Sequence, residues 1–125
     1  MPALLRNPIA PFGKRVVTTA GTPVLLFTTT EVPIAAQGIW PVRVADIRVE
    51  ALNSNTGLVY IGTSGMNKTT LVGVLFTISA PGGNPIVNAI NFSSFFDGTN
   101  RFRPQDYYLD ADVSGEGVIR TCWIN

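Results

Sequence analysis

The stretch DYYLDADVSGEGVIRTCWI, residues 106–124, determines the fold that this sequence predicts. Apolar and acidic residues alternate through residues 106–113, and a period of two is the pattern of a β-strand. Residues 114–117 (SGEG) then supply two glycines where the chain must reverse. Residues 118–124 are apolar at both parities, which is typical of a central or interface strand. We therefore predict a hairpin with its turn at Gly115–Gly117.

The composition fits a single domain with an unusually uncharged surface. The chain has 125 residues, of which 46% are apolar and 14% are charged. Soluble domains contain about 25% charged residues. Either polar uncharged loops make up the difference, or part of the surface is buried against a partner. The net charge of +1 gives no electrostatic attraction to nucleic acid or to a membrane surface.

Neither a membrane span nor a signal peptide is indicated. The longest apolar runs, such as residues 24–27, are far too short to cross a bilayer. The N-terminal segment is interrupted by prolines and lacks a continuous apolar core. We expect a protein that is made in the cytoplasm of its cell.

Short strands separated by turn residues recur along the chain, and no stretch keeps a helical period. The strands that we predict are residues 14–19, 23–30, 42–52, 58–62, 71–80, 86–92, 106–113 and 118–124. In the longest of them the apolar parity changes, which predicts a β-bulge close to Ala45-Asp46. The pattern indicates one all-β domain, an antiparallel β-sandwich or jelly roll, over residues 14–125.

Residues 1–13 (MPALLRNPIAPFG) form a separate segment in this prediction, an extended N-terminal arm. Three prolines exclude regular structure, yet the arm has apolar side chains that are poorly suited to water. These are Leu4, Leu5, Ile9 and Phe12. Two interpretations stay open: a frayed tail, or an arm packed on a neighbouring subunit.

Several kinds of chemistry are disfavoured by the residues present. The chain has no histidine, which removes the commonest general base and metal ligand. Cys122 is the lone cysteine and lies in an apolar strand, as expected for a core thiol rather than a nucleophile. Residues 62–70 (GTSGMNKTT) resemble a phosphate loop, but the Gly-Lys step and the following helix are missing. We predict no enzyme and no cofactor.

One group of carboxylates is dense enough to consider as a site. It consists of Asp106, Asp110, Asp112 and Glu116. The structural interpretation is a solvated acidic face, paired with Arg101, Arg103 or Arg120. The alternatives are a calcium site, although the spacing of a calcium loop is absent, or a paired-carboxylate hydrolase.

Aromatic residues and arginines gather in residues 93–104. Phe95, Phe96 and Phe102 lie there with Arg101 and Arg103, a combination that can stack on single-stranded nucleic acid. With a net charge near zero, a subunit interface is the better interpretation, because aromatic residues and arginine are enriched at interfaces.

Three segments together resemble a group of small tailed-phage structural proteins: AGTPV at 20–24, IRVEALxxNTGxVYIGxSG at 47–65 and YYLDADVSGEGV at 107–118. The likeness covers residues 14–118. Proteins of this group are similar to β-sandwich capsid decoration (cement) proteins, which sit on the outer shell, often as trimers. The resemblance implies a virion protein on the capsid surface that bridges subunits of the major capsid protein.

The expected partners are therefore the major capsid protein and two further copies of this chain in a homotrimer, with neither nucleic acid nor membrane. We expect the interfaces to use apolar and aromatic residues of the arm, the aromatic loop and the last strand: Leu4, Leu5, Ile9, Phe12, Phe95, Phe96, Arg101, Phe102 and Trp123. The alternatives are a head–tail or tail component, and a carbohydrate-binding module that uses Trp40, Trp123 or Tyr107.

Overall fold

A computed structural model describes residues 9–28, 44–81, 88–93 and 106–124. In this part of the chain the regular structure is β, arranged as two antiparallel four-stranded sheets without an α-helix. Over the same residues, no helix offers the length and hydropathy that crossing a membrane would require. The all-β class that the sequence predicted is therefore confirmed.

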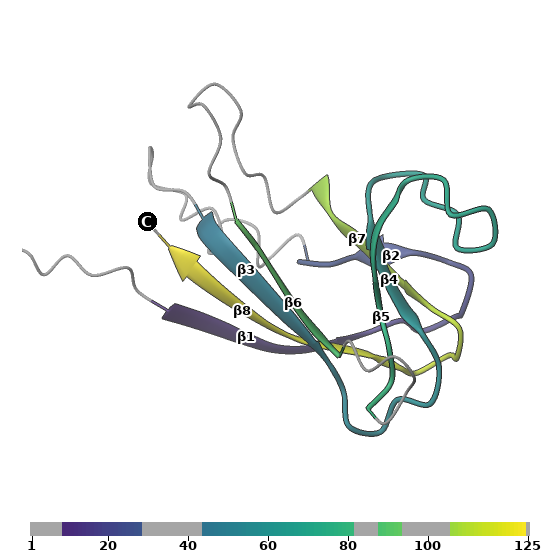
Figure 1. The fold of residues 1–125 in the computed structure, drawn as a ribbon, viewed down its shortest axis with the longest axis horizontal. Coiled ribbons are helices and arrows are strands. Elements are labelled where there is room, and N and C mark those ends of the chain that lie inside the picture. The colour runs from purple at the N-terminus through teal and green to yellow at the C-terminus, as the bar shows by residue number, and fades with distance from the viewer. Residues whose placement is uncertain (1–8, 29–43, 82–87, 94–105, 125) are drawn as a thin grey trace, which may run out of the picture.

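Eight strands form the two sheets, which lie on opposite sides of Figure 1. The first sheet has the order β1-β8-β3-β6 and the second the order β2-β7-β4-β5. The strand bounds are β1 Ile9–Val16, β2 Val24–Leu25, β3 Val44–Ala51, β4 Val59–Gly62, β5 Val74–Ile78, β6 Ala89–Ser93, β7 Tyr108–Ala111 and β8 Gly117–Ile124. Every strand predicted from the sequence overlaps one of these.

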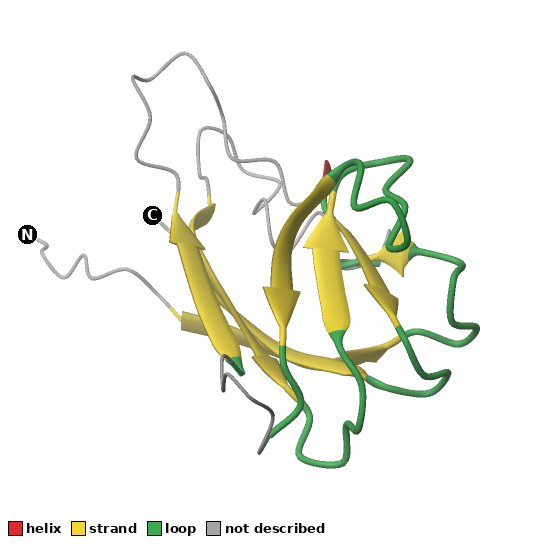
Figure 2. Cartoon of the chain, turned by 45° about the vertical axis from the view of Figure 1, so that its right-hand side comes forward, coloured by secondary structure: helices red, strands yellow, loops and turns green. Residues whose placement is uncertain are grey.

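Among the described strands, successive strands alternate between the sheets at every connection except β4 to β5. Figure 2 shows the described loops, such as those between β3 and β4 and between β7 and β8, at the ends of the sheets. Because of this alternation, the last strand, β8, lies in the first sheet and pairs there with both β1 and β3. The central position of residues 118–124, predicted from their two apolar parities, is confirmed.

The predicted hairpin is wrong, because β7 and β8 belong to different sheets. A hairpin would place the apolar faces of both strands on the same side of one sheet. Instead, Leu109 and Val118 both enter the core that the two sheets share. The turn backbone bonds to neighbouring loops: Gly115 N donates to the Val17 carbonyl at 2.7 Å, and Asp112 N donates to the Leu58 carbonyl at 3.0 Å.

The two glycines of this turn serve different purposes. Gly115 has a φ of +88°, a left-handed conformation that glycine adopts without steric cost. Gly117 begins β8, where a Cβ atom would overlap the Arg15 carbonyl of the adjacent strand. The first glycine lets the chain turn, and the second lets β8 approach β1.

The bulge predicted near Ala45-Asp46 is confirmed. The register of β3 against β8 shifts between Val44 and Asp46. This extra residue reconciles the two parities, so that Ile47 and Val49 turn into the core with no exposed surface.

Both sheets contribute to one apolar core. Its fully or nearly fully buried members are Val17, Leu26, Phe27, Ile47, Val49, Ala51, Val59, Ile61, Ile78, Leu109, Ala111 and Val118. Each large member contributes about 1.5–3 kcal/mol when it is removed from water. The core therefore holds the two sheets together face to face.

The sheet begins at Ile9, within the segment predicted as an arm of residues 1–13. Residues 9–13 are the first part of β1, and Ile9 pairs with Trp123 of β8. Phe12 packs against the core, with its ring edge-on to Phe27 at a centroid distance of 5.4 Å. Residues 1–8, with Leu4 and Leu5, lie outside the described part of the chain.

Candidate functional site

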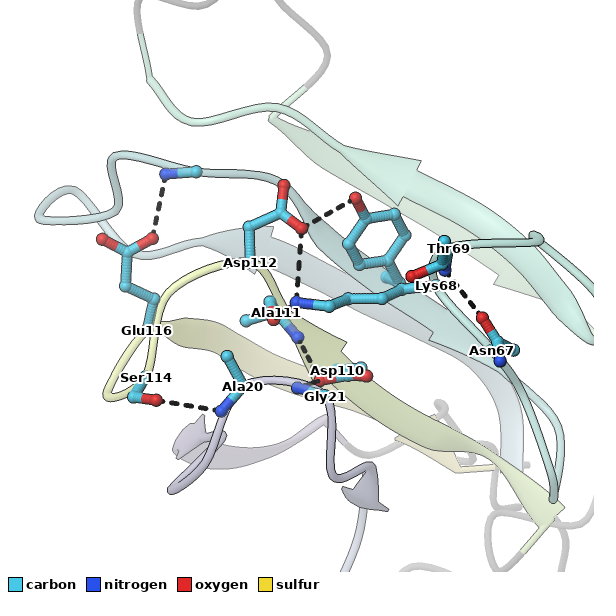
Figure 3. A network of polar contacts seen from close by, with 12 residues as sticks. Ala20, Gly21, Asn67, Lys68, Thr69, Asp110, Ala111, Asp112, Ser114 and Glu116 are labelled. Carbon is cyan, nitrogen blue, oxygen red and sulfur yellow. Dashed lines mark hydrogen bonds and ion pairs between the residues drawn. The ribbon is translucent and has the colours of Figure 1, made fainter.

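Three of the four carboxylates singled out in the sequence, Asp110, Asp112 and Glu116, lie at the end of β7 and in the β7–β8 connection, where Figure 3 shows their polar contacts. Asp110 is on β7, and its side chain is 1% exposed. Its Oδ1 accepts hydrogen bonds from Gly21 N at 2.9 Å and from Ala111 N at 2.7 Å. Nearby, Ser114 Oγ accepts a hydrogen bond from Ala20 N at 2.9 Å. These bonds attach the β1–β2 loop to the end of β7.

Glu116 attaches a second loop, between β3 and β4. Its Oε2 accepts from Thr56 N at 2.7 Å and Thr56 Oγ1 at 2.9 Å, while Oε1 accepts from Gly57 N at 3.0 Å. Burial raises the pKa of this carboxyl, but the hydrogen bonds from Gly57 and Thr56 outweigh it, so the net pKa is lowered. Glu116 therefore remains ionised although it is almost fully buried.

The neighbouring Asn55 strengthens the same attachment. Its Nδ2 donates to the Gly117 carbonyl at 2.8 Å, and its Oδ1 accepts from Gly117 N at 3.2 Å. This buried amide thus satisfies both backbone groups of the residue that begins β8. Loss of Asn55 Oδ1 would remove this acceptor from the buried Gly117 N, whereas the Gly117 carbonyl also accepts a hydrogen bond from Leu52 N at 3.2 Å.

Asp112 attaches a third loop, between β4 and β5. Its Oδ1 accepts from Tyr60 Oη at 3.0 Å and lies 3.5 Å from Lys68 Nζ. Lys68 Nζ also donates to the Ala111 carbonyl at 2.8 Å. Burial, the hydrogen bond to Asp112 and the nearby negative charges raise the pKa of Tyr60 to about 12. This tyrosine therefore stays neutral and remains a donor across the physiological range.

The predicted solvated acidic face is wrong for Asp110 and Glu116, whereas Asp106 and Asp112 are exposed. Asp110 and Glu116 are buried, and the carboxylates of Asp110, Asp112 and Glu116 bond three different loops instead of sharing one surface. In the described part of the chain, no three acidic, histidine or cysteine side chains are placed to hold a metal ion together. The arrangement fixes the loop conformations at this end of the sandwich.

Arg120, predicted as a partner of the acidic face, lies instead in the interior and is 1% exposed. Its guanidinium donates to four carbonyls: Leu26 at 2.8 Å, Phe12 at 2.9 Å, Gly13 at 3.3 Å and Lys14 at 3.4 Å. It also lies over the rings of Phe12 and Phe27, at 5.9 and 5.4 Å from their centroids. The side chain thus joins β8 to β1 and to the end of β2.

The sequence contained the signal for this role. Arg120 has the same parity as Val118, which is fully buried, so the alternation places it inward. Sequence reasoning missed it because a charged side chain suggests an ionic partner rather than a set of carbonyl acceptors.

The β4–β5 loop, residues 63–73, was considered and rejected as a phosphate site, and sequence reasoning identified no other role for it. Met66 of this loop is buried, but two other apolar side chains point to solvent: Leu71 is 56% exposed and Val72 is 67% exposed. Leu75, at the start of β5, is 49% exposed. Three large apolar side chains within five residues form the most concentrated exposed apolar group in the described chain.

A hollow of about 380 Å³ lies beside this loop, lined by Thr63, Ser64, Asp106 and Tyr108. Three hydroxyl groups, a carboxylate and an aromatic ring are suited to hydrogen-bonding and stacking with a sugar. Tyr107, the tyrosine predicted for such a role, is instead half-buried, and burial followed by the charge of Asp106 raises its pKa. Trp40 lies outside the described residues.

Most of the predicted interface residues also lie outside the described residues: Leu4, Leu5, Phe95, Phe96, Arg101 and Phe102. The structure brings two others together, since Ile9 and Trp123 are paired neighbours in β1 and β8. Phe12, the last of the set, packs partly into the core.

Comparison of this chain with protein-family models, with curated proteins and with solved structures finds no match.

Proposed function

We propose that this chain is a non-enzymatic structural protein that binds the outer surface of a phage capsid as a decoration protein. The proposal includes a jelly-roll architecture, which is supported by the alternation of strands between the two four-stranded sheets. Capsid and lectin domains use this architecture. The topology and the sequence resemblance together favour a virion protein.

The observation on which the proposal rests is the use of polar side chains to fix loops. Asp110, Asp112 and Glu116 each bond a different loop. A sandwich end with fixed loops is suited to contact with another protein, since little conformational entropy is lost on binding. Contact, rather than chemistry, is the function that this arrangement supports.

The proposed mechanism is multivalent contact. Each copy joins neighbouring subunits of the major capsid protein, and the symmetry of the shell multiplies weak contacts into high avidity. A homotrimer at a local three-fold axis fits this role. No cofactor, nucleic acid or membrane takes part.

The test is to image phage particles assembled with and without this chain. The proposal expects additional density at symmetric positions on the outer surface, together with earlier disruption of the undecorated shells by heat. Identical shells, or density confined to the tail, would contradict it, and the latter would favour a tail component.

The second candidate is glycan binding, favoured by the hollow that Thr63, Ser64 and Tyr108 line. A glycan array with the full chain separates the two functions, because a decoration protein should give no signal. Binding that is lost on Tyr108→Ala but retained on Tyr107→Phe would establish the second function in place of the first.

A further inference from the structure

The hollow beside the β4–β5 loop is formed by two segments that are far apart in the sequence. Asp106 and Tyr108 come from the start of β7 and the residues before it, and Thr63 and Ser64 come from the loop that follows β4. The register of the second sheet brings these segments together, because Gly62 of β4 pairs with Tyr108. The volume of the hollow, about 380 Å³, lies within the range of small-ligand sites.

The loop side of the hollow is held in place by backbone hydrogen bonds. Thr63 N donates to the Gly73 carbonyl at 2.9 Å, and Met66 N donates to the Thr63 carbonyl at 3.1 Å. Gly62 allows this close approach, since a Cβ atom there would overlap the Gly73 carbonyl. The hydroxyl groups of Thr63 and Ser64 are therefore presented on an ordered support, and a ligand does not have to order the loop when it binds.

The lining of the hollow carries a negative charge. Of the four lining residues only Asp106 is charged, and it is exposed to solvent. The one cation of the β4–β5 loop, Lys68, lies 3.5 Å from Asp112, donates to the Ala111 carbonyl and is not part of the lining. A cationic ligand therefore meets a carboxylate and, among the described lining residues, no cation that would repel it.

The groups in the hollow are complementary to a primary ammonium group, which carries only donors. A carboxylate is acceptor-only and offers about four lone-pair positions, so Asp106 can accept from a ligand as well as from donors of the protein. The hydroxyl oxygens of Thr63 and Ser64 are further acceptors, and the face of the Tyr108 ring attracts a cation. A neutral hydroxyl group of a ligand would use the acceptors but would gain nothing from the charge.

The volume and the hydroxyl groups favour an amino sugar over a lysine side chain. A lysine side chain is narrow and leaves most of the hollow empty, whereas a sugar ring brings hydroxyl groups to Thr63 and Ser64 and an apolar face to Tyr108. We propose that the hollow binds the protonated amine of an amino sugar, and that Asp106 selects its charge. The inference deepens the second candidate function and rests on it, because it requires that the chain binds a glycan.

The test compares trisaccharides of glucosamine, N-acetylglucosamine and glucose, which carry an ammonium, an acetamide and a hydroxyl group at the same position of each ring. Their dissociation constants for the full chain are measured by nuclear magnetic resonance, from shifts of the amide signals at a slightly acid pH where the amine is protonated. An exposed ion pair together with a cation–π contact should give the glucosamine trisaccharide about three- to tenfold tighter binding than either neutral one. The preference should shrink at high salt, since ions screen an exposed pair.

A variant assigns the preference to one residue. Asp106→Asn keeps the shape and the hydrogen-bonding capacity of the side chain but removes its charge. It should abolish the preference and leave the binding of the glucose trisaccharide unchanged. The matched control is Glu50→Gln, which neutralises a partly exposed carboxylate on β3 of the other sheet and should keep the full preference. The same spectra show whether each variant is folded.

The outcomes separate the inference from the function on which it rests. Equal binding of the trisaccharides would overturn the inference and leave glycan binding standing, and a preference that survives Asp106→Asn would overturn the role of Asp106. Absence of binding to all of them would overturn both the inference and the second candidate function, and would leave the decoration function standing. Nα-acetyl-lysine amide is the remaining probe. If it binds as tightly as the glucosamine trisaccharide, the ligand is a lysine side chain of a partner protein, and the amino sugar is overturned.

Discussion

Two regions of this protein reverse the usual rule that charged side chains are exposed and apolar side chains are buried. Arg120, Asp110 and Glu116 are buried, whereas Leu71 and Val72 are the most exposed large apolar residues in the described chain. In the first region each charge is matched by backbone groups. In the second region the apolar groups have no comparable internal role. The comparison indicates that the buried charges maintain the fold, whereas the exposed apolar side chains contribute little to it.

Replacement of Arg120 by methionine should have the largest effect. The change keeps most of the side-chain volume but leaves the carbonyls of Leu26 and Phe12 without this donor in the interior. We expect a loss of at least about 3 kcal/mol in the free energy of unfolding, measured with urea.

The matched control is Arg48→Met, which removes an arginine of the same sheet from an exposed position. Arg48 lies 3.8 Å from Glu50, and the pair is partly exposed to water. Its loss should change the free energy of unfolding by less than about 1 kcal/mol. Equal effects of the two substitutions would show that the buried arginine has no special role in the fold.

Glu116→Gln should cost about 2 kcal/mol at neutral pH, because the amide must turn an N–H group toward the donors of Thr56 or Gly57. The effect should depend on pH. The pKa of Glu116 is lowered by folding, so its contribution to stability is present above its ordinary value of 4.5 and is lost as pH falls below that value.

Urea unfolding of the native chain and the variant should therefore converge as the pH is lowered from 7 to 3 (an interval of about 4 units that spans the carboxyl titration). A gap between the two proteins that is constant with pH would mean that the hydrogen-bond geometry matters and the charge does not.

Tyr60→Phe should have a smaller effect, about 1 kcal/mol, because it removes one hydrogen bond to the partly exposed Asp112. The pKa of Tyr60 is raised by folding from 10.0 to about 12, so its contribution is full below pH 10 and is lost as the pH rises toward 12.

Native protein should lose stability across this alkaline interval more steeply than Tyr60→Phe, as measured by urea unfolding at successive pH values. Tyr107, whose pKa is also raised, should leave part of the slope in the variant. Equal slopes in both proteins would show that Tyr60 ionises as easily in the folded state as in the unfolded one.

The sequence predicted the strands and the bulge in β3 because both are local patterns of alternation. It did not predict that β7 and β8 lie in different sheets, since a turn with two glycines is compatible with a hairpin or with a crossing between sheets. The difference is decided by partners distant in sequence, since Gly115 N donates to the carbonyl of Val17, near the start of the chain.

The candidate site was harder to predict for a related reason. The carboxylates were recognised from their density, but their roles depend on loops at residues 20–21, 56–57 and 68 that the fold brings to them. The unusual conformation of Leu71 could not be predicted from the sequence. Leu71 has a positive φ, and no feature of the sequence TTLVG requires a leucine to adopt one.

The smallest expected effect on stability is that of Leu71→Gly, and it is the most informative for the comparison. Leu71 and Gly73 have nearly the same backbone angle, with φ of +66° and +77°. At Gly73 a Cβ atom would lie 3.1 Å from Met66 Cα, so Gly73→Ala adds crowding to strain and should cost about 1–2 kcal/mol. At Leu71, removal of the side chain relieves strain and loses little packing. Glycine also raises the backbone entropy of the unfolded state, which lowers stability. These terms nearly cancel, so the free energy of unfolding should change by less than about 1 kcal/mol. The measurement is urea unfolding at low concentration, where association does not contribute. A large loss of stability in Leu71→Gly would place this leucine with the residues that maintain the fold, and the division between buried charges and exposed apolar groups would not hold at residue 71.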